Sequence, residues 1–180
     1  RFKCDWSSDV CSSDLAGGCF WCIESVFSYI NGVKDVVNGY SGGNKDNPTY
    51  EEVKSQLTNH RETIRITYDE NEISFTDLLK VFLENVDPFD DGGQFIDRGF
   101  SYTLAIFYQD DNEYQESIKL IEELEKKTNK KVYISLVKFD KFYLAEEEHQ
   151  DYYLKNKEEF EEELIKSGRK KWKEWILWKF

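Results

Sequence analysis

The stretch GGCFWCIESVF, residues 17–27, carries two cysteines three positions apart, Cys19 and Cys22. Apolar residues recur at helical spacing after them, so Cys19 is expected at or just before the start of a helix. Unpaired backbone N–H groups and the positive end of the helix dipole favour a thiolate there. Cys22 falls one turn further on the same face, within reach of a disulfide. This spacing predicts a reactive thiol at Cys19 with a second thiol beside it.

Several other interpretations of the two cysteines stay open. Both are compatible with small buried hydrophobic residues next to Phe20 and Trp21. A zinc site would need Cys4 and Cys11, whose spacing forms no second CxxC. A thioredoxin-like thiol-disulfide oxidoreductase is the main rival, because CxxC near alternating strands and helices is its signature. Bulky aromatics between the cysteines suit an apolar pocket better than a surface that docks other proteins' disulfides.

Composition indicates one soluble globular domain. The chain has 180 residues, with 36 acidic and 24 basic side chains and a formal net charge of −12. That charge repels a phosphate backbone, so nucleic acid is not an expected partner. No apolar run reaches the length of a membrane span, and no stable membrane association is expected. With all four cysteines in the first 22 residues, thiol chemistry is favoured over a disulfide scaffold, and we expect a cytoplasmic protein.

The two ends of the chain stand apart from the rest. Residues 1–15, RFKCDWSSDVCSSDL, show neither helix nor strand periodicity and are expected to be a poorly structured or non-native leader. Residues 16–180 are expected to form a single domain. The end of the chain, RKKWKEWILWKF, is basic and has tryptophans at three-residue spacing. Packing of those tryptophans on the domain is favoured over a membrane-surface or partner-binding helix.

Periodicity after residue 60 predicts alternating strands and helices. Strands are expected at 62–69, 100–108 and 131–139, helices at 74–88, 110–130 and from 144 onward, and long Gly-rich loops at 39–53 and 87–99. The strands are short and amphipathic rather than continuously apolar. This favours an α+β fold with helices on one side of a sheet.

Six ordered motifs identify a family resemblance: GGCFWCIE, GYSGG, NPTYEEV, NHRETIRITYD, DPFDDGGQFIDRGFSYTLAIFY and EEEHQDYYLKN. Together they resemble the peptide-methionine (S)-S-oxide reductases, the MsrA family. The resemblance implies a two-layer α/β sandwich of the ferredoxin-like plait type, around a mixed sheet with long functional loops. It makes residues 16–180 one catalytic reductase domain. The implied activity is reduction of methionine S-sulfoxide, free or in proteins, which repairs oxidised proteins.

The resemblance also implies roles for the cysteine motif. Cys19 would attack the sulfoxide sulfur, and Phe20 and Trp21 would line the pocket for the substrate's methyl group. Reaction leaves Cys19 as a sulfenic acid, which condenses with a nearby thiol. Many family members supply that thiol near the C-terminus, but no cysteine follows Cys22 here. Cys22 is therefore the candidate resolving residue, and otherwise an external thiol must attack Cys19. Thioredoxin is the expected reductant, with no metal or organic cofactor.

Four further residues match the family's site. Tyr50, Glu62 and Tyr102 correspond to residues that hydrogen-bond the sulfoxide oxygen, with Glu62 as proton donor, and Asp97 matches an acidic residue in the preceding loop. The chemistry is sound in itself, because a sulfoxide becomes a good electrophile when its oxygen is protonated. A carboxyl in an apolar site has a raised pKa and serves as a general acid. The two histidines, His60 and His149, are expected to make structural hydrogen bonds.

Overall fold

The computed structural model describes residues 10–169, and the tryptophans of the basic C-terminal stretch lie outside that range. The main sheet has the strand order β7-β6-β1-β3-β2-β8. Its strands are β1 (Val10–Ala16), β2 (Val33–Ser41), β3 (Arg61–Asp69), β6 (Leu104–Tyr108), β7 (Ile134–Lys138) and β8 (Phe142–Leu144). A separate small hairpin pairs β4 (Gly93–Gln94) with β5 (Asp97–Arg98). The helices are α1 (Phe20–Phe27), α2 (Tyr50–Lys54), α3 (Phe75–Glu84), α4 (Asp111–Thr128), α5 (Tyr152–Lys155) and α6 (Lys157–Ser167), with short 3-10 helices η1 (Phe100–Tyr102) and η2 (Glu147–His149).

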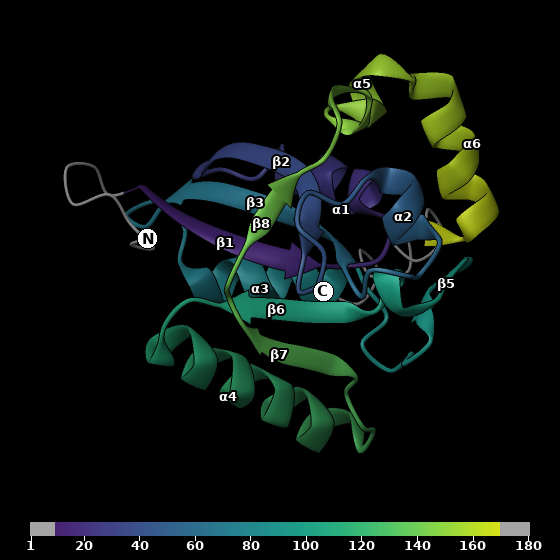
Figure 1. Ribbon diagram of the computed structural model, residues 1–180. Coiled ribbons are helices and arrows are strands. Elements are labelled where there is room, and N and C mark those ends of the chain that lie inside the picture. The colour runs from purple at the N-terminus through teal and green to yellow at the C-terminus, as the bar shows by residue number, and fades with distance from the viewer. Residues whose placement is uncertain (1–9, 170–180) are drawn as a thin grey trace.

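The centre of the fold is a β-α-β-β-α-β unit made of β1, α1, β2, β3, α3 and β6 (Figure 1). Its four strands lie in the order β2-β3-β1-β6 and pair antiparallel throughout. This is the topology of the ferredoxin-like plait. Strand β7 adds to β6 in parallel, so the whole sheet is mixed. The predicted α+β sandwich around a mixed sheet is therefore confirmed.

The prediction that residues up to 15 lack regular structure is wrong for residues 10–15, which belong to β1. This strand lies inside the sheet between β3 and β6. The strand contains polar residues, so a hydropathy pattern does not predict it. The buried ones each have a hydrogen-bond partner far along the chain. Asp14 accepts two hydrogen bonds from Arg65, at 2.8 and 3.1 Å. The hydroxyl of Ser13 donates to Glu113 at 3.4 Å. Residues 1–9 of the expected leader lie outside the described part.

One face of the sheet is covered by α1, α3 and α4, which share a single apolar core with it. Leu78, Leu79 and Phe82 of α3 are fully buried there, and Leu15 of β1 lies among them. Helix α3 begins where the hydroxyl of Ser74 accepts the N–H of Asp77 at 3.1 Å. This core contains most of the fully buried apolar side chains of the described residues, and burial of such side chains is the dominant favourable contribution to folding. Within residues 10–169, no helix is both long and apolar enough to cross a membrane.

Several predicted boundaries differ from the structure. The loop predicted at 39–53 is shorter, because β2 continues to Ser41 and pairs with β8. Gly39 permits that pairing, since an added Cβ would lie 2.3 Å from the Phe142 ring. Residues 100–102 form η1 instead of a strand, and 131–133 precede β7. The helix expected from 144 onward is divided into η2, α5 and α6. Asp151, with a left-handed φ of 53°, separates η2 from α5, and Asn156, with φ of −128°, separates α5 from α6.

Candidate active site

Cys19 lies where the chain leaves β1 and enters α1, as the N-cap residue of that helix. Gly17 and Gly18 make the turn before it, and Gly18 has φ of +81°, which glycine adopts without strain. Cys19 and Cys22 are both free thiols and both buried. They pack with Phe160 of α6 in a small cluster of their own. The sequence analysis therefore placed Cys19 at a helix start correctly.

The two thiols are hydrogen-bonded to each other, and this hydrogen bond shifts their pKa values in opposite directions. It raises the pKa of Cys19, and burial and the carboxylates of Glu62 and Asp97 raise it further. The same hydrogen bond lowers the pKa of Cys22 against the opposing effect of burial, with help from Arg169. The expectation of a lowered pKa at Cys19 is thus wrong for this arrangement. The hydrogen bond with Cys22 and burial are the main causes of the raised pKa of Cys19, and the two carboxylates add to it.

Glu62 stands at the start of β3, next to the helix start that carries the cysteines. The backbone N–H of Phe20 donates to its Oε2 at 3.0 Å. Its side chain is buried, and burial raises its pKa to about 8, although the hydrogen bond from Phe20 opposes the rise and the nearby charge of Asp97 adds to it. At neutral pH Glu62 therefore holds a proton that it can give to a substrate.

Two tyrosines flank this carboxyl. Tyr50 is the first residue of α2, which Thr49 caps through a reciprocal pair of hydrogen bonds with Glu52. Tyr102 ends η1, and its hydroxyl hydrogen-bonds the Glu62 carboxyl. Burial raises the pKa of both phenols, and the charge of Glu62 raises it further. Both hydroxyls consequently remain protonated donors over the physiological range.

Asp97 approaches the cysteines from the β4–β5 hairpin. Burial raises its pKa, and Arg169 partly offsets that rise. Its Oδ2 lies 3.9 Å from Nη2 of Arg169. The charge of Asp97 acts on Cys19 and Glu62 alike. All of the acids, phenols and thiols expected at the site are thus close enough to influence one another.

An aromatic wall stands beside this polar group. The Phe20 ring lies 6.2 Å from the Tyr50 ring and is stacked with it. Trp21 stacks on Tyr152 at 4.0 Å and on His149 at 5.7 Å. These rings come from α1, α2, η2 and α5. Phe20 and Trp21 therefore belong to one aromatic cluster with residues that lie far apart in the sequence.

Sequence reasoning missed the supporting role of the EEEHQDYY motif. Glu146 accepts hydrogen bonds from the Tyr40 hydroxyl at 2.8 Å and the Tyr50 N–H at 2.9 Å. His149, expected to hydrogen-bond, has no such partner at either ring nitrogen among the described residues and packs 4.3 Å from the Tyr50 ring instead. The density of aromatic and acidic residues in the motif is the signal that could have revealed this supporting role.

Glu24 of α1 was also missed. It accepts hydrogen bonds from the Asn38 side chain at 2.7 Å and the Asp151 N–H at 2.8 Å. Burial raises its pKa to about 7, and both of these hydrogen bonds oppose the rise. It joins α1, β2 and the turn before α5, and so holds the cysteine helix in place.

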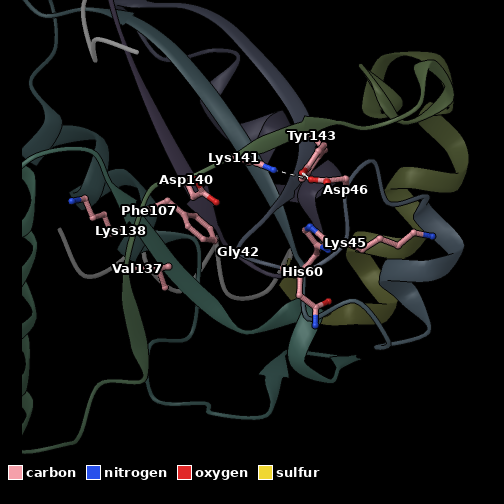
Figure 2. A pocket seen from close by; sticks show the side chains of 12 residues that line it. Gly42, Lys45, Asp46, His60, Phe107, Val137, Lys138, Asp140, Lys141 and Tyr143 are labelled. Atoms are coloured by element: carbon pink, nitrogen blue, oxygen red, sulfur yellow. Dashed lines mark hydrogen bonds and ion pairs between the residues drawn. The ribbon is translucent and has the colours of Figure 1, made fainter.

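A cavity of about 400 Å³ lies elsewhere, between the end of β2 and the connection from β7 to β8 (Figure 2). His60 and Tyr143 line it together with Lys141, which is ion-paired to Asp46 at 2.8 Å. None of the residues predicted for the active site lines this cavity. In the part of the chain that the structure describes, no three His, Cys, Asp or Glu side chains gather in a way that would hold a metal ion.

Comparison with known proteins identifies the family. The family described as "Peptide methionine sulfoxide reductase" matches residues 12–177. The chain belongs to this family. MsrA 2 of Staphylococcus aureus (strain MW2) is 45% identical over 158 residues, which cover 87% of this chain and 89% of the relative. The MsrA/MsrB protein of Vibrio cholerae is 41% identical over 165 residues, which cover 91% of this chain and 44% of that longer relative.

Solved structures support the same assignment. Mxr1 from Saccharomyces cerevisiae in reduced form superposes with a TM-score of 0.79 at 30% identity, covering 85% of this chain and 88% of that one. Together with the family match, this superposition confirms the predicted MsrA resemblance. Members of this family reduce methionine sulfoxide, and this chain is one of them.

Proposed function

We propose that the chain reduces the S-epimer of methionine sulfoxide, free or in proteins, with Cys19 as the nucleophile. The observation that carries the proposal is the pairing of Cys19 with a buried, protonated carboxyl. Glu62 has its pKa raised to about 8 by burial and is tied to the residue after Cys19 by the 3.0 Å hydrogen bond from Phe20. A thiol and a general acid held together in an apolar site are what sulfoxide reduction requires.

The chemistry proceeds by transfer of oxygen between two sulfur atoms. Glu62 protonates the sulfoxide oxygen while Tyr50 and Tyr102 donate hydrogen bonds to it. The Cys19 sulfur attacks the sulfoxide sulfur, its thiol proton returns to Glu62, and oxygen passes to Cys19. The thioether is released and Cys19 remains as a sulfenic acid. Asp97 keeps negative charge near the site, which favours the protonated form of Glu62.

Phe20 and Trp21 select the substrate in this proposal. Their rings are apolar and follow Cys19 directly in the first turn of α1, which suits the methyl group of methionine sulfoxide. Stacking of Trp21 on Tyr152 at 4.0 Å holds that surface in one position. A rigid wall on one side and hydroxyl donors on the other fix the orientation of methyl and oxygen, which is the basis for choosing one epimer.

Cys22 then resolves the sulfenic acid, forming a disulfide with Cys19 and releasing water. The hydrogen bond between the two thiols supports this step. We propose thioredoxin as the reductant of this disulfide and the cytoplasm as the compartment, where thiols are kept reduced. The yeast relative Mxr1 has been solved in complex with Trx2, which supports a protein dithiol as partner. No prosthetic group takes part in the proposed reaction.

The test is to supply S- and R-methionine sulfoxide separately, with dithiothreitol or with thioredoxin and its reductase, and to measure methionine. Wild type should act on the S-epimer. Cys19→Ser should abolish turnover with both reductants. Cys22→Ser, a matched cysteine variant three residues away, should keep turnover with dithiothreitol and lose it with thioredoxin.

Activity that survives Cys19→Ser would refute the nucleophile assignment, and activity on the R-epimer alone would refute the proposed selectivity. The thioredoxin-like alternative predicts reduction of insulin disulfides without reduction of sulfoxide. The family assignment favours sulfoxide reduction over that exchange.

A further inference from the structure

Arg169 follows α6 and Gly168, and its side chain turns back into the protein. It is 3% exposed. Its guanidinium lies over the Phe95 ring at 4.5 Å and reaches the Asp97 carboxylate at 3.9 Å, which is longer than a hydrogen bond. Arg169 thereby contacts the β4–β5 hairpin that carries Asp97.

The guanidinium also borders the turn that leads into Cys19. An added Cβ on Gly18 would lie 2.7 Å from Nη2 of Arg169. From the same side, Phe160 and Leu164 of α6 pack with the two cysteines. Figure 1 shows α5 and α6 on the side of the molecule that carries α1 and α2. The residue that follows Gly168 therefore brings a positive charge to the turn just before Cys19.

Two nitrogens of this guanidinium, Nε and Nη2, are buried and make no hydrogen bond to any described residue. Burying a charged group whose nitrogens lack hydrogen-bond partners is unfavourable. An arrangement of this kind is suited to an anion that forms at a particular stage of a reaction. The charge of Arg169 acts on Cys22, Asp97 and Glu163.

Of these three groups, Cys22 belongs to the reacting pair. The charged and titratable groups facing it are Cys19 on the same helix, Glu62, Asp97, Glu163 and Arg169. The three carboxyl groups disfavour a thiolate at Cys22 and Arg169 favours it. Arg169 is the cation named among the main groups that shift the pKa of Cys22.

We propose that Arg169 is a positioning residue that holds Cys22 as a thiolate for attack on the oxidised Cys19. The inference rests on the proposed function, because it concerns the second step of that reaction. The Cys22 thiolate forms a bond to the Cys19 sulfur, and the S–O bond of the sulfenic acid breaks. Hydroxide leaves and takes a proton from Glu62 or solvent to become water. Cys22 is oxidised and Cys19 reduced, both ending in the disulfide.

The experiment follows one turnover without reductant. Wild type, Arg169→Met and Arg169→Lys are each mixed with one equivalent of S-methionine sulfoxide. Methionine is quantified, sulfenic acid is trapped with dimedone, and the Cys19–Cys22 disulfide is mapped by peptide mass. Lys166→Met on α6 removes the same charge from an exposed position and is the matched control. Per methionine formed, Arg169→Met should close the disulfide about tenfold more slowly, because the thiolate fraction of Cys22 sets the rate of closure. More of the Cys19 sulfenic acid should then be trapped by dimedone.

Arg169→Lys should recover part of the closure rate, and Lys166→Met should match wild type. Disulfide closure at the wild-type rate in Arg169→Met would overturn the inference. If Arg169→Met does not fold, a second measurement decides. The thiolate absorbance of Cys19→Ser, with Cys19→Ser/Cys22→Ser subtracted, should titrate at a lower pH than that of Cys19→Ser/Arg169→Lys. Titration at the same pH in both variants would also overturn the inference. Absence of methionine from wild type would instead refute the proposed function.

Discussion

The backbone N–H of Phe20 donates to Oε2 of Glu62 at 3.0 Å, although the two residues are 42 positions apart. This bond links the start of α1, which carries Cys19, to the start of β3, which carries the acid. Pairing of Leu15 with Ile64 sets the register between the strands on either side. The distance between nucleophile and acid is thus a consequence of how β1 and β3 pair.

The proton on Glu62 should set the upper pH limit of activity. Burial raises its pKa to about 8, so the acid form is present at pH 7 and is lost as the pH rises through about 8. Sulfoxide reduction under dithiothreitol should therefore fall above that pH. Glu62→Gln cannot donate the proton and should lower kcat by about 10² to 10⁴. Rates across a pH series check both points.

Glu24→Gln is the control for that series, because Glu24 is also a buried carboxyl on α1 with a raised pKa, but it bonds Asn38 and Asp151. It should retain the decline above pH 8 that the wild type shows. A Glu62→Gln variant with wild-type kcat would show that another group supplies the proton.

Removal of the phenolic hydroxyls should slow the chemical step. Tyr50→Phe and Tyr102→Phe each delete a donor whose raised pKa keeps it protonated. Each should lower kcat by about 100-fold, as for other donors that stabilise developing charge on oxygen. Tyr133→Phe, at a partly exposed position before β7, is the matched control and should leave kcat unchanged. An equal loss in all three variants would point to a general loss of folded protein.

Strand β1 should be essential for stability. Leu15 is 0% exposed in the centre of the core, so Leu15→Ala should reduce the free energy of unfolding by about 2 to 5 kcal/mol. Leu57→Ala makes the same change at a residue that is 81% exposed and should stay within about 0.5 kcal/mol of wild type. Urea titration followed by circular dichroism measures both. Equal stability of the two variants would contradict a central position for β1.

Gly18 should tolerate no side chain. Its φ is +81°, and an added Cβ would lie 2.6 Å from Cβ of Gln94 and 2.7 Å from Nη2 of Arg169. Gly18→Ala should therefore lower both stability and reductase activity. Gly168→Ala has a similar φ of +78° with nothing within 4 Å, so it should cost only about 1 kcal/mol for the backbone conformation. Urea titration and kcat are measured for both variants, and the difference between them gives the effect of the close contacts at Gly18. Equal losses in the two variants would contradict an effect of those contacts.

The chemistry-bearing residues were predictable because their types and order are local properties of the sequence. The CFWC motif predicted a thiol at a helix start, and alternation in ETIRITYD predicted the strand that carries Glu62. Six ordered motifs were sufficient for the family resemblance and the plait. Their assigned roles stay predictions until the variants are measured.

Three features were decided by the tertiary structure alone. Residues 10–15 form a central strand because Arg65 and Glu113 pair with its polar side chains. Cys19 has a raised pKa because folding surrounds it with a thiol and two carboxyl groups. Arg169 reaches the thiol pair because α6 packs across it. In each case the deciding partner lies far along the chain, and burial strengthens an interaction that no local pattern of residues reveals.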